Sequence, residues 1–335
     1  MKLAIVLASA AIAPTGGVRI QGLMWRDGLS KLGHSVQLIN YWESNDWKSY
    51  DAIIVIGFGQ SFRQLMKGLS SYNIPLIVAP ILDPDRSKLM YKFLIKWWGF
   101  HRYLGLTTNF HDLYLGSKYA SLFLTRSDQE SEYLSYCCDV PTSKIKKVPL
   151  SFRINPVNSY PNKESFCFHA SRLAASNKNV KRLILAAKKY KFKLVLAGVL
   201  YGAEEKNWLE EQIKSEKNIS YVGVLSDEEL RDYYIRAKVF ALPSLVEGVG
   251  MVALEAAACG CEVILTNIGA PKEYYNGMAK LVDPFSVDDI GKGILECTEN
   301  GFAQPLLCEY IKENYSSDTC SRKLELAIKT VIGKK

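Results

Sequence analysis

The chain has 335 residues, more than one hydrophobic core usually serves, so we expect two domains. Hydrophobic residues make up 48% and charged residues 23% of the sequence, which is typical of globular proteins and argues against long disordered segments. The net charge of +8 is unevenly spread, because residues 1–160 hold 18 Lys and Arg against 11 Asp and Glu, whereas residues 161–335 hold 24 against 23. A basic first half is compatible with nucleic acid, an anionic membrane or a phosphorylated acceptor.

The N-terminal segment Lys2–Ile12 places a single Lys before an apolar run, a pattern shared by signal peptides and buried strands. We predict a strand, because Gly16, Gly17 and an amphipathic helix follow at once. No stretch reaches the roughly 18 apolar residues of a membrane-spanning helix, and we expect a cytoplasmic protein. The eight cysteines include no CxxC pair and no His at zinc spacing, so we expect reduced, structural thiols.

Apolar runs alternate with amphipathic segments along most of the chain, which predicts βα units around two parallel sheets and therefore an α/β fold. The strands expected in the first half are Leu3–Ala8, Val36–Asn40, Ala52–Ile56, Pro75–Ile81, Ser121–Leu124 and Ile145–Val148, with helices over Val18–Leu32, Ser61–Ser70 and Asp128–Tyr136. The second half repeats the scheme with strands Phe166–His169, Leu194–Ala197, Ile219–Val222, Val239–Leu242, Val263–Leu265 and Lys280–Val282, and helices Val180–Tyr190, Asp227–Ala237 and Met251–Cys259.

Residues 153–163 lack periodicity and contain two prolines, so they are predicted to link the domains. We expect an N-terminal domain over residues 1–155 and a C-terminal domain over residues 156–316, followed by a terminal helical pattern over residues 317–335. Ligands of open α/β sheets lie beyond the carboxyl ends of the strands. Two such sheets facing one another would share a site across an interdomain cleft.

The main functional signal follows the predicted strand Val239–Leu242. The turn Gly248–Val249–Gly250–Met251 leads into a helix, and backbone N–H groups at a helix N-terminus favour a phosphate. Glu247 and Glu255 lie close to this anion site, where carboxylates are useful if they accept hydrogen bonds from hydroxyls of a sugar and a ribose. Taken singly, each glutamate also fits a solvated surface position.

Two cations follow the predicted strand Phe166–His169. Arg172 and Lys178 come at the carboxyl end of this strand and just before the next helix. Arg can bind a diphosphate through two parallel hydrogen bonds, and Lys supplies a point charge. Their position favours a phosphate-binding role over ordinary surface charge.

The second half resembles a known family over roughly residues 165–285, namely the retaining nucleotide-sugar glycosyltransferases of family 4. The two glutamates separated by seven residues are the most specific part of this resemblance. It implies the GT-B fold, in which two Rossmann-like doubly wound domains face an interdomain cleft. The matching motifs are His169–Leu173, Lys178–Val180, Leu196–Gly198, Tyr221–Gly223, Glu229–Leu230, Phe240–Ser244, Glu247–Gly250, Leu254–Ala256, Cys259–Gly260 and Val282–Pro284.

By this resemblance, Arg172 and Lys178 would bind the donor diphosphate and Glu247 would contact the donor sugar near its reacting carbon. Glu255 would accept hydrogen bonds from the ribose hydroxyls, and the backbone at Val224 would contact the base. The resemblance implies no metal and no other cofactor, and it implies that the terminal helix over residues 317–335 packs back onto the first domain. It also implies that the anomeric configuration is retained, with the leaving phosphate taking the proton of the acceptor.

The first half matches the family less well. Its Gly16 and Gly17 resemble the family's opening loop, where glycine lets the backbone approach the donor phosphates. The family's usual His after the fourth strand is missing, and Asp83 in this place is a candidate for acceptor contact. Asp83 and Asp85 flank a proline at a spacing that holds metal in another glycosyltransferase fold, but such a pair is more commonly a turn.

Residues 88–102 form a basic and aromatic amphipathic pattern. Lys88, Lys92 and Lys96 recur every four residues, while Leu89, Phe93, Ile95 and Trp97 fill much of the remaining surface. Such a helix suits a membrane interface. It equally suits a helix packed on the first sheet with a solvated lysine face, and the basic charge of this half favours the membrane.

Together these signals predict a metal-independent, retaining glycosyltransferase that moves a sugar from a UDP- or GDP-sugar to a glycan or lipid-linked saccharide. Its expected setting is cell-surface polysaccharide or glycoconjugate biosynthesis, in the cytoplasm or peripherally on the inner face of the membrane. One alternative is a sugar-nucleotide epimerase or phosphorylase of the same fold. Another is a non-catalytic nucleotide-sugar-binding protein. Nucleic acid is disfavoured because no basic-aromatic recognition motif is present.

Overall fold

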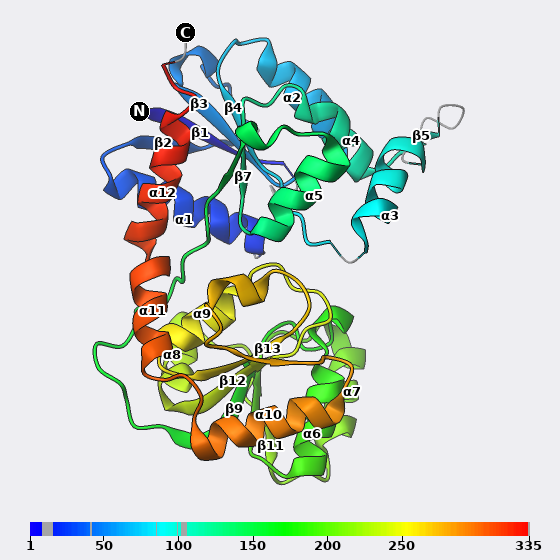
Figure 1. Cartoon of the computed structure of the whole chain (residues 1–335), viewed down its shortest axis with the longest axis vertical. Helices are drawn as coiled ribbons and strands as arrows, with labels where there is room; N and C mark the ends of the chain where they lie inside the picture. Colours follow the sequence, from blue (N-terminus) through cyan, green and yellow to red (C-terminus); the bar gives the residue numbers. More distant parts are fainter. Residues whose placement is uncertain (9–15, 41, 85, 99, 102–105, 334–335) are drawn as a thin grey trace. The chain divides into compact units, whose positions relative to one another are not determined.

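The computed structural model describes the chain except residues 9–15, 41, 85, 99, 102–105 and 334–335 (Figure 1). It divides into two compact units, Met1–Leu150 with Ser317–Lys335, and Ser151–Ser316. Each unit contains a six-stranded parallel sheet flanked by helices. The predicted α/β fold with two Rossmann-like units is therefore confirmed.

The sheet of the first unit has the order β2-β1-β3-β4-β7-β8. The inner strands are buried along nearly their whole length, as expected for parallel strands that are covered on both faces. All the strands predicted in this half are confirmed to within a few residues. They are β1 (Lys2–Leu7), β2 (Ser35–Leu38), β3 (Ala52–Ile56), β4 (Leu76–Ala79), β7 (Leu122–Thr125) and β8 (Ile145–Lys147).

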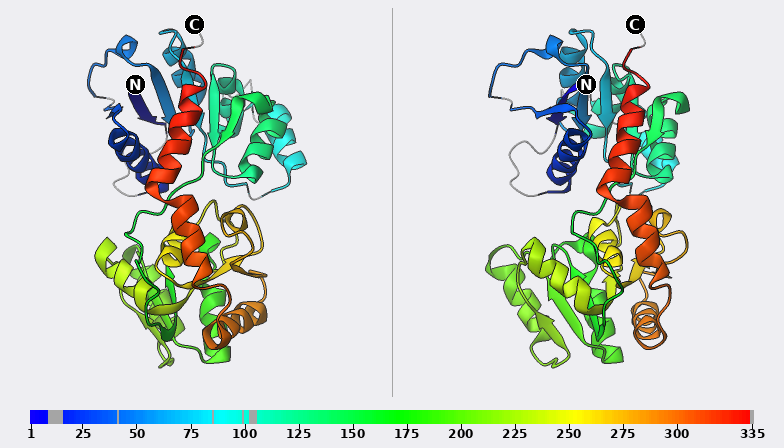
Figure 2. Two further views of the ribbon diagram at one scale, coloured as in Figure 1. Left: turned by 60° about the vertical axis from the view of Figure 1, so that its left-hand side comes forward. Right: turned by 90° about the vertical axis from the view of Figure 1, so that its left-hand side faces the viewer.

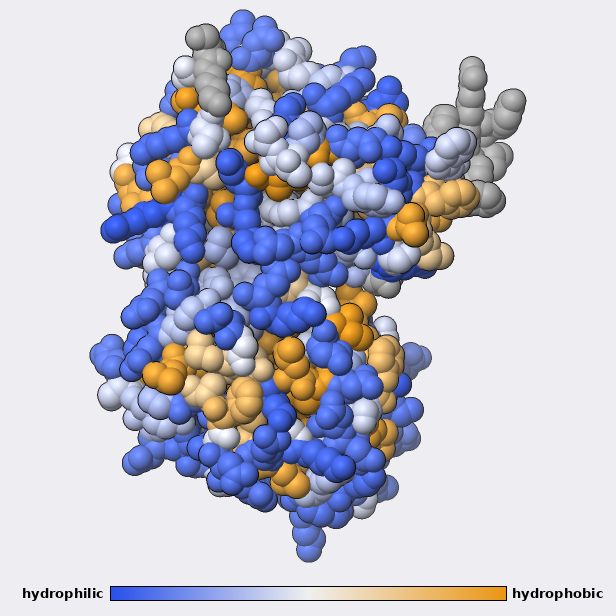
Figure 3. Space-filling view, viewed as in Figure 1, coloured by the Kyte–Doolittle hydropathy of each residue, from blue (hydrophilic) through white to orange (hydrophobic). Residues whose placement is uncertain are grey.

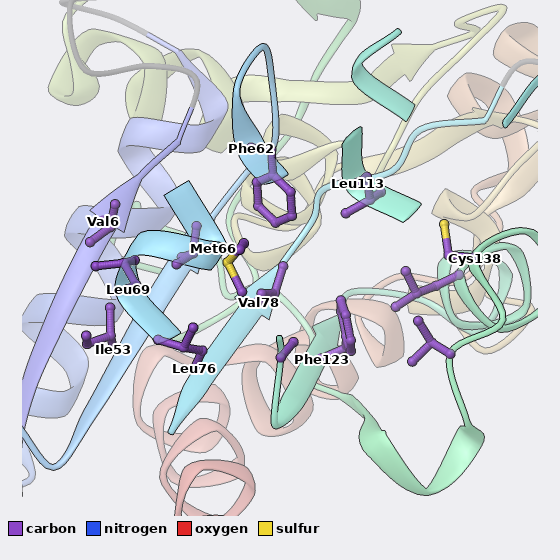
Figure 4. Packing of buried hydrophobic residues seen from close by; sticks show 14 of the residues in the cluster. Val6, Ile53, Phe62, Met66, Leu69, Leu76, Val78, Leu113, Phe123 and Cys138 are labelled. Carbon is purple, nitrogen blue, oxygen red and sulfur yellow. The ribbon is translucent and has the colours of Figure 1, made fainter. Parts of the chain in front are cut away.

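Helices cover both faces of this sheet (Figures 1 and 2). One face packs against α2 (Phe62–Ser70), α4 (Asn109–Ser117) and α5 (Asp128–Cys138). Figure 4 shows this core, where Phe62 and Met66 of α2 lie close to Val78 of β4. The other face packs against α1 (Gly17–Lys31) and α12 (Ser317–Lys329).

The C-terminal helix α12 belongs to the first unit, although its residues come last in the chain. It packs on α1 at Gly28, where a Cβ atom would come within 2.0 Å of the Ser321 hydroxyl oxygen. Leu324 and Ile328 of α12 are fully buried in the core. Glycine at position 28 thus allows the close approach of the two helices.

The sheet of the second unit has the order β11-β10-β9-β12-β13-β14. The chain order reverses between β9 and β12, which is the switch point where open α/β sheets bind ligands. The strands are β9 (Glu164–Ala170), β10 (Leu194–Ala197), β11 (Ile219–Tyr221), β12 (Ala237–Leu242), β13 (Glu262–Thr266) and β14 (Lys280–Val282). The helices are α6 (Val180–Tyr190), α7 (Gly202–Ile213), α8 (Asp227–Arg236), α9 (Met251–Ala258), α10 (Val287–Asn300) and α11 (Leu306–Tyr315).

The boundary between the units lies earlier than the predicted residue 155. Residues 153–163, predicted as a link, belong to the second unit, where Ile154 and Val157 are buried. The Val157 N–H donates to the Ala258 carbonyl at 3.3 Å, and Arg231 Nε donates to the Asn155 carbonyl at 2.8 Å. The prolines correctly indicated an irregular segment, but its apolar side chains anchor it to the second unit.

The segment 88–102 departs most from prediction. The α-helix α3 (Lys88–Phe93) continues as a π-helical turn, Leu94–Trp98, and then β5 (Phe100–His101) pairs antiparallel with β6 (Leu106–Thr107). The lysines, for which the sequence left a solvated face as one alternative, are 23–42% exposed and contact residues of α5 and its C-terminal end. Lys88 donates to Glu132 and Lys96 to Asp139, while Lys92 Nζ lies 4.2 Å from the Tyr136 ring centre.

All eight cysteines are free and buried, as expected for reduced structural thiols. Burial raises the pKa of Cys138 to about 12 and that of Cys261 to about 11. Across the described part of the chain, no helix is both long and apolar enough to cross a membrane.

Candidate active site

The candidate site is built on the switch point of the second sheet. β9 and β12 are neighbouring parallel strands, so the loops that follow them leave the same edge of the sheet. The loop after β9 carries Arg172 and Lys178, and the loop after β12 carries Glu247. The fold therefore brings together residues that are about 70 positions apart in the sequence.

Lys178 and Glu247 form a direct ion pair. Lys178 Nζ donates to Glu247 Oε2 at 2.7 Å, and the buried Ser244 hydroxyl donates to the same oxygen at 2.9 Å. The two side chains are only 23% and 12% exposed, so water screens their attraction weakly. The pair is a positive and a negative charge fixed side by side at the edge of the sheet.

Hydrogen bonds tie the two loops to each other. The Leu245 N–H donates to the Asn177 carbonyl at 2.8 Å. The buried Asn179 amide donates to the carbonyls of Pro243 and Pro284 at 2.9 and 2.7 Å, which also secures the loop after β14. Asn179 has a φ of 59°, a left-handed conformation that asparagine tolerates better than most residues. These contacts fix the backbone under Lys178 and Glu247.

His169 supports the site from below. Its Nδ1 lies 2.7 Å from the Ala241 carbonyl oxygen, and its Nε2 lies 2.7 Å from the Ser171 hydroxyl. Because a carbonyl only accepts, Nδ1 carries the proton and Nε2 accepts from Ser171. Complete burial lowers the pKa of His169 to about 4, so the ring is neutral near pH 7 and links the ends of β9 and β12. These bonds give His169 a structural role in the site.

Arg172 makes a separate ion pair. Its Nη2 donates to Glu205 of α7 at 3.1 Å, and its guanidinium carbon lies 5.0 Å from the Tyr201 ring centre. The side chain is 52% exposed. Bonds from the Tyr201 N–H and from Arg172 lower the pKa of Glu205, so this carboxylate is a negative partner that holds Arg172 in place.

Glu255 of α9 is buried rather than open to solvent. Its Oε1 accepts from Arg153 Nε at 2.9 Å, and Arg153 also donates to Asp227 at 3.0 Å. Burial raises the pKa of Glu255, and the Arg153 charge opposes that rise. A contact between Glu255 and ribose therefore stays a prediction, because Arg153 binds its Oε1 and the Tyr234 hydroxyl lies 3.5 Å from its Oε2.

The turn between Glu247 and α9 has the expected form. Val249 is buried, and Gly250 has a φ of 70° that favours glycine. A Cβ atom at Gly250 would also lie 3.1 Å from Leu242. α9 begins at Met251, so the loop after β12 leads directly into a helix N-terminus.

The other predicted residues are on other loops of the chain. Val224 follows β11 and is exposed. Gly16 and Gly17 begin α1 of the first unit, and Asp83 follows β4 there, where Arg126 Nη2 donates to its Oδ1 at 2.7 Å. Asp85 lies outside the described residues. Within the residues that the structure describes, no group of three or more His, Cys, Asp or Glu side chains could hold a metal ion.

Sequence reasoning missed several supporting residues. Ser244 and Asn179 stood inside quoted motifs, but nothing in the pattern showed that they bond to Glu247 or to the neighbouring loops. Arg153 was assigned to the link, and its pairing with Glu255 spans about 100 positions of the sequence. The signal that could have found them is their closeness in the sequence, since Asn179 follows Lys178 directly and Ser244 precedes Glu247 by three residues.

The comparisons with known proteins agree with this architecture. Residues 152–317 match the family model described as glycosyl transferases group 1. The chain is 31% identical over 130 residues to the O-antigen chain mannosyltransferase B of Escherichia coli, a match that covers 37% of this chain and 34% of that protein. The matches to this and the next curated relatives span about a third of their length or less.

Two solved structures share the fold along their whole length. The sucrose-phosphate synthase of Thermosynechococcus elongatus has a TM-score of 0.77 at 15% identity and covers 100% of both chains. Anabaena HepE in complex with UDP and glucose has a TM-score of 0.70 at 14% identity and covers 99% of this chain and 100% of that one. Residues 152–317 therefore form a glycosyl transferases group 1 domain, and the chain has the GT-B fold.

Proposed function

We propose that this chain transfers a sugar from a UDP- or GDP-sugar to a hydroxyl of a glycan or lipid-linked saccharide, with retention of configuration. The observation that carries the proposal is the Lys178–Glu247 ion pair at the switch point of the second sheet. A cation and a carboxylate held together there suit a ligand that carries both a phosphate and sugar hydroxyls.

In the proposed mechanism, the donor separates this ion pair. Lys178 turns to the diphosphate, where its charge stabilises the negative charge that develops on the leaving group. Glu247 then accepts hydrogen bonds from the sugar and stabilises positive character at its ring. Arg172 leaves Glu205 to bind the same diphosphate, and the N-terminus of α9 with the turn Gly248–Met251 adds backbone N–H groups.

The remaining predicted contacts complete the donor site. Glu255 would hold the ribose once Arg153 gives up its bond, and the backbone of Val224 would contact the base. Gly16 and Gly17 of the first unit would supply backbone N–H groups to the phosphates. Because Arg172 and Lys178 supply positive charge at the diphosphate, we propose that transfer requires no metal.

Product analysis tests the function. The purified chain is incubated with UDP-glucose or GDP-mannose, with and without glycan acceptors, and with EDTA added. We expect a new α-linked product, because both donors are α-linked and retention keeps that configuration, at a rate that EDTA does not change. An isomerised donor without transfer would indicate the epimerase, phosphorolysis of a glycan would indicate the phosphorylase, and tight donor binding without any reaction would indicate the binding protein.

A separate observation favours an acceptor at a membrane. The segment Lys88–Trp98 exposes four large apolar side chains, and Leu89 and Trp97 are 72% and 79% exposed. Figure 3 shows hydrophobic residues gathered over the region of α3. The first unit also holds 22 Lys and Arg against 13 Asp and Glu, whereas the second holds 20 against 21. We propose that this apolar ridge (Leu89, Met90, Phe93 and Trp97) rests peripherally on the anionic inner face of the membrane.

Flotation with liposomes tests the membrane contact. The double variant Phe93→Glu/Trp97→Glu should lose binding to vesicles that contain phosphatidylglycerol, and wild-type binding should weaken as salt is raised. The control is Leu306→Glu/Leu326→Glu, which changes two leucines that are about equally exposed elsewhere in the chain. Equal flotation of the two double variants would exclude the apolar ridge as the contact.

A further inference from the structure

The turn after β4 of the first unit is strained. Ile81 has a φ of 59°, in the left-handed region that branched side chains rarely adopt. Such a conformation persists only where surrounding contacts enforce it, and it is concentrated at functional sites. The turn lies at the carboxyl end of a strand of a parallel sheet, which is the edge where ligands of such sheets bind.

A buried ion pair enforces this turn. The carboxylate of Glu130 on α5 accepts from the Leu82 N–H at 2.6 Å and from the Arg126 N–H at 2.7 Å. Arg126 Nη2 donates to the Leu82 carbonyl at 3.1 Å, and Arg126 Nε donates to Glu130 at 3.1 Å. The side chains of Arg126 and Glu130 are 9% and 1% exposed. Both polar groups of the Leu82 backbone are thus held by one ion pair.

The same arginine orients Asp83. Arg126 Nη2 donates to Asp83 Oδ1 at 2.7 Å, while the Asp83 side chain remains 40% exposed. Burial opposes the positive charge of Arg126, but Glu130 and Asp83 more than offset this and raise the pKa of the guanidinium. The guanidinium of Arg126 therefore contacts both the Glu130 and the Asp83 carboxylates.

Resting on the transferase function proposed above, we infer that Arg126 and Glu130 are positioning residues that hold the Asp83 carboxylate for a hydroxyl of the acceptor. A carboxylate accepts hydrogen bonds from sugar hydroxyls and repels phosphate. The class of acceptor that reaches this turn is therefore a neutral or amino sugar rather than the phosphate of a lipid carrier.

The test is the variant Asp83→Asn, which keeps the shape and the bond from Arg126 but removes the charge. We expect the KM for the acceptor to rise about tenfold, as for loss of one charged hydrogen bond of about 1.4 kcal/mol. The donor Kd, measured without acceptor, should not change. Asp128→Asn is the matched control, because Asp128 is an exposed, lysine-paired aspartate of the same unit.

The variant Arg126→Lys tests the positioning role. Lysine keeps a positive charge but lacks the guanidinium Nη2 that donates to the Leu82 carbonyl and to Asp83. The acceptor KM should therefore rise again, while the donor Kd stays constant. Combined with Asp83→Asn, it should add little further loss, because the two residues act as one unit. An unchanged acceptor KM in Asp83→Asn, in a preparation whose wild type transfers sugar, would overturn the inference and leave the transferase function intact. A wild type that transfers no sugar would instead contradict the function itself.

Discussion

Lys178 and Glu247 neutralise each other in the free protein, so each loses a partner when the other is removed. We predict that Lys178→Ala lowers kcat/KM by about 10²–10³, as for other groups that stabilise charge on a leaving group. Lys189→Ala is the control, since this exposed lysine of α6 pairs with Asp288 away from the loops of the site. Steady-state kinetics with saturating acceptor measure both variants, and equal rates would remove Lys178 from the mechanism.

His169 makes the stability of the second unit depend on pH. The folded protein resists protonation of this ring until the pH nears its pKa of about 4, whereas an unfolded His takes up a proton near pH 6.5. Stability is therefore highest above pH 6.5 and falls as the pH drops toward 4, by about 3 kcal/mol at most. Urea unfolding of wild type and His169→Gln at several pH values should show a difference that shrinks toward low pH. Parallel curves would contradict this prediction.

At this scale, the sequence predicted candidate ligand-binding residues but not the partners that hold them, and the roles of these candidates stay predictions. Arg172, Lys178 and Glu247 could be predicted because their chemistry and their places after strands are visible in the chain. The bonds of Arg172 to Glu205 and of Glu255 to Arg153 could not, because a pairing between distant side chains depends on packing. Asp83 was predicted without any sign of Arg126, which holds it.

The three loops around the site depend on one side chain at the start of α6. We predict that Asn179→Ala destabilises the second unit by about 3 kcal/mol, because two buried carbonyls lose their donor and alanine resists the left-handed backbone. Asn179→Gly keeps the backbone favourable and should lose less. Urea unfolding separates the two contributions, and equal losses in both variants would assign the whole effect to the amide.

The regular elements were predictable because long apolar runs define buried parallel strands. β3, β10, β14 and α6 have the predicted bounds. The short β5–β6 pair and the π-helical turn were missed, since two-residue strands leave no periodic pattern. The partners of Lys88, Lys92 and Lys96 were not predicted, because a repeat every four residues shows that the lysines share a face but not what that face contacts.

Across the whole chain, the last helix stabilises the unit that contains the first strand. Deleting residues 317–335 removes Leu324 and Ile328, whose burial contributes about 1.5–3 kcal/mol each, a large part of the 5–15 kcal/mol of a typical domain. We predict that hydrogen exchange accelerates throughout residues 1–150 of the truncated protein but not in β9–β14. Accelerated exchange in both units would contradict the independence of their cores.

A point variant refines this test. Leu324→Ala should cost about 2–5 kcal/mol, because this side chain is fully buried. Leu326→Ala should cost little, since that leucine of the same helix is 64% exposed. Thermal unfolding compares the two variants. A loss for Leu324→Ala alone would show that the packing of α12 in the core stabilises the first unit, rather than the helix propensity of α12.

The buried thiols can report how often each of the two units opens to solvent. Cys137, Cys138 and Cys320 lie in the first unit, and the other five cysteines lie in the second. A thiol that is buried and protonated reacts with an alkylating reagent only when its surroundings open. Mass spectrometry of alkylated peptides would therefore time the opening of each unit separately in the unmodified protein, with no probe introduced.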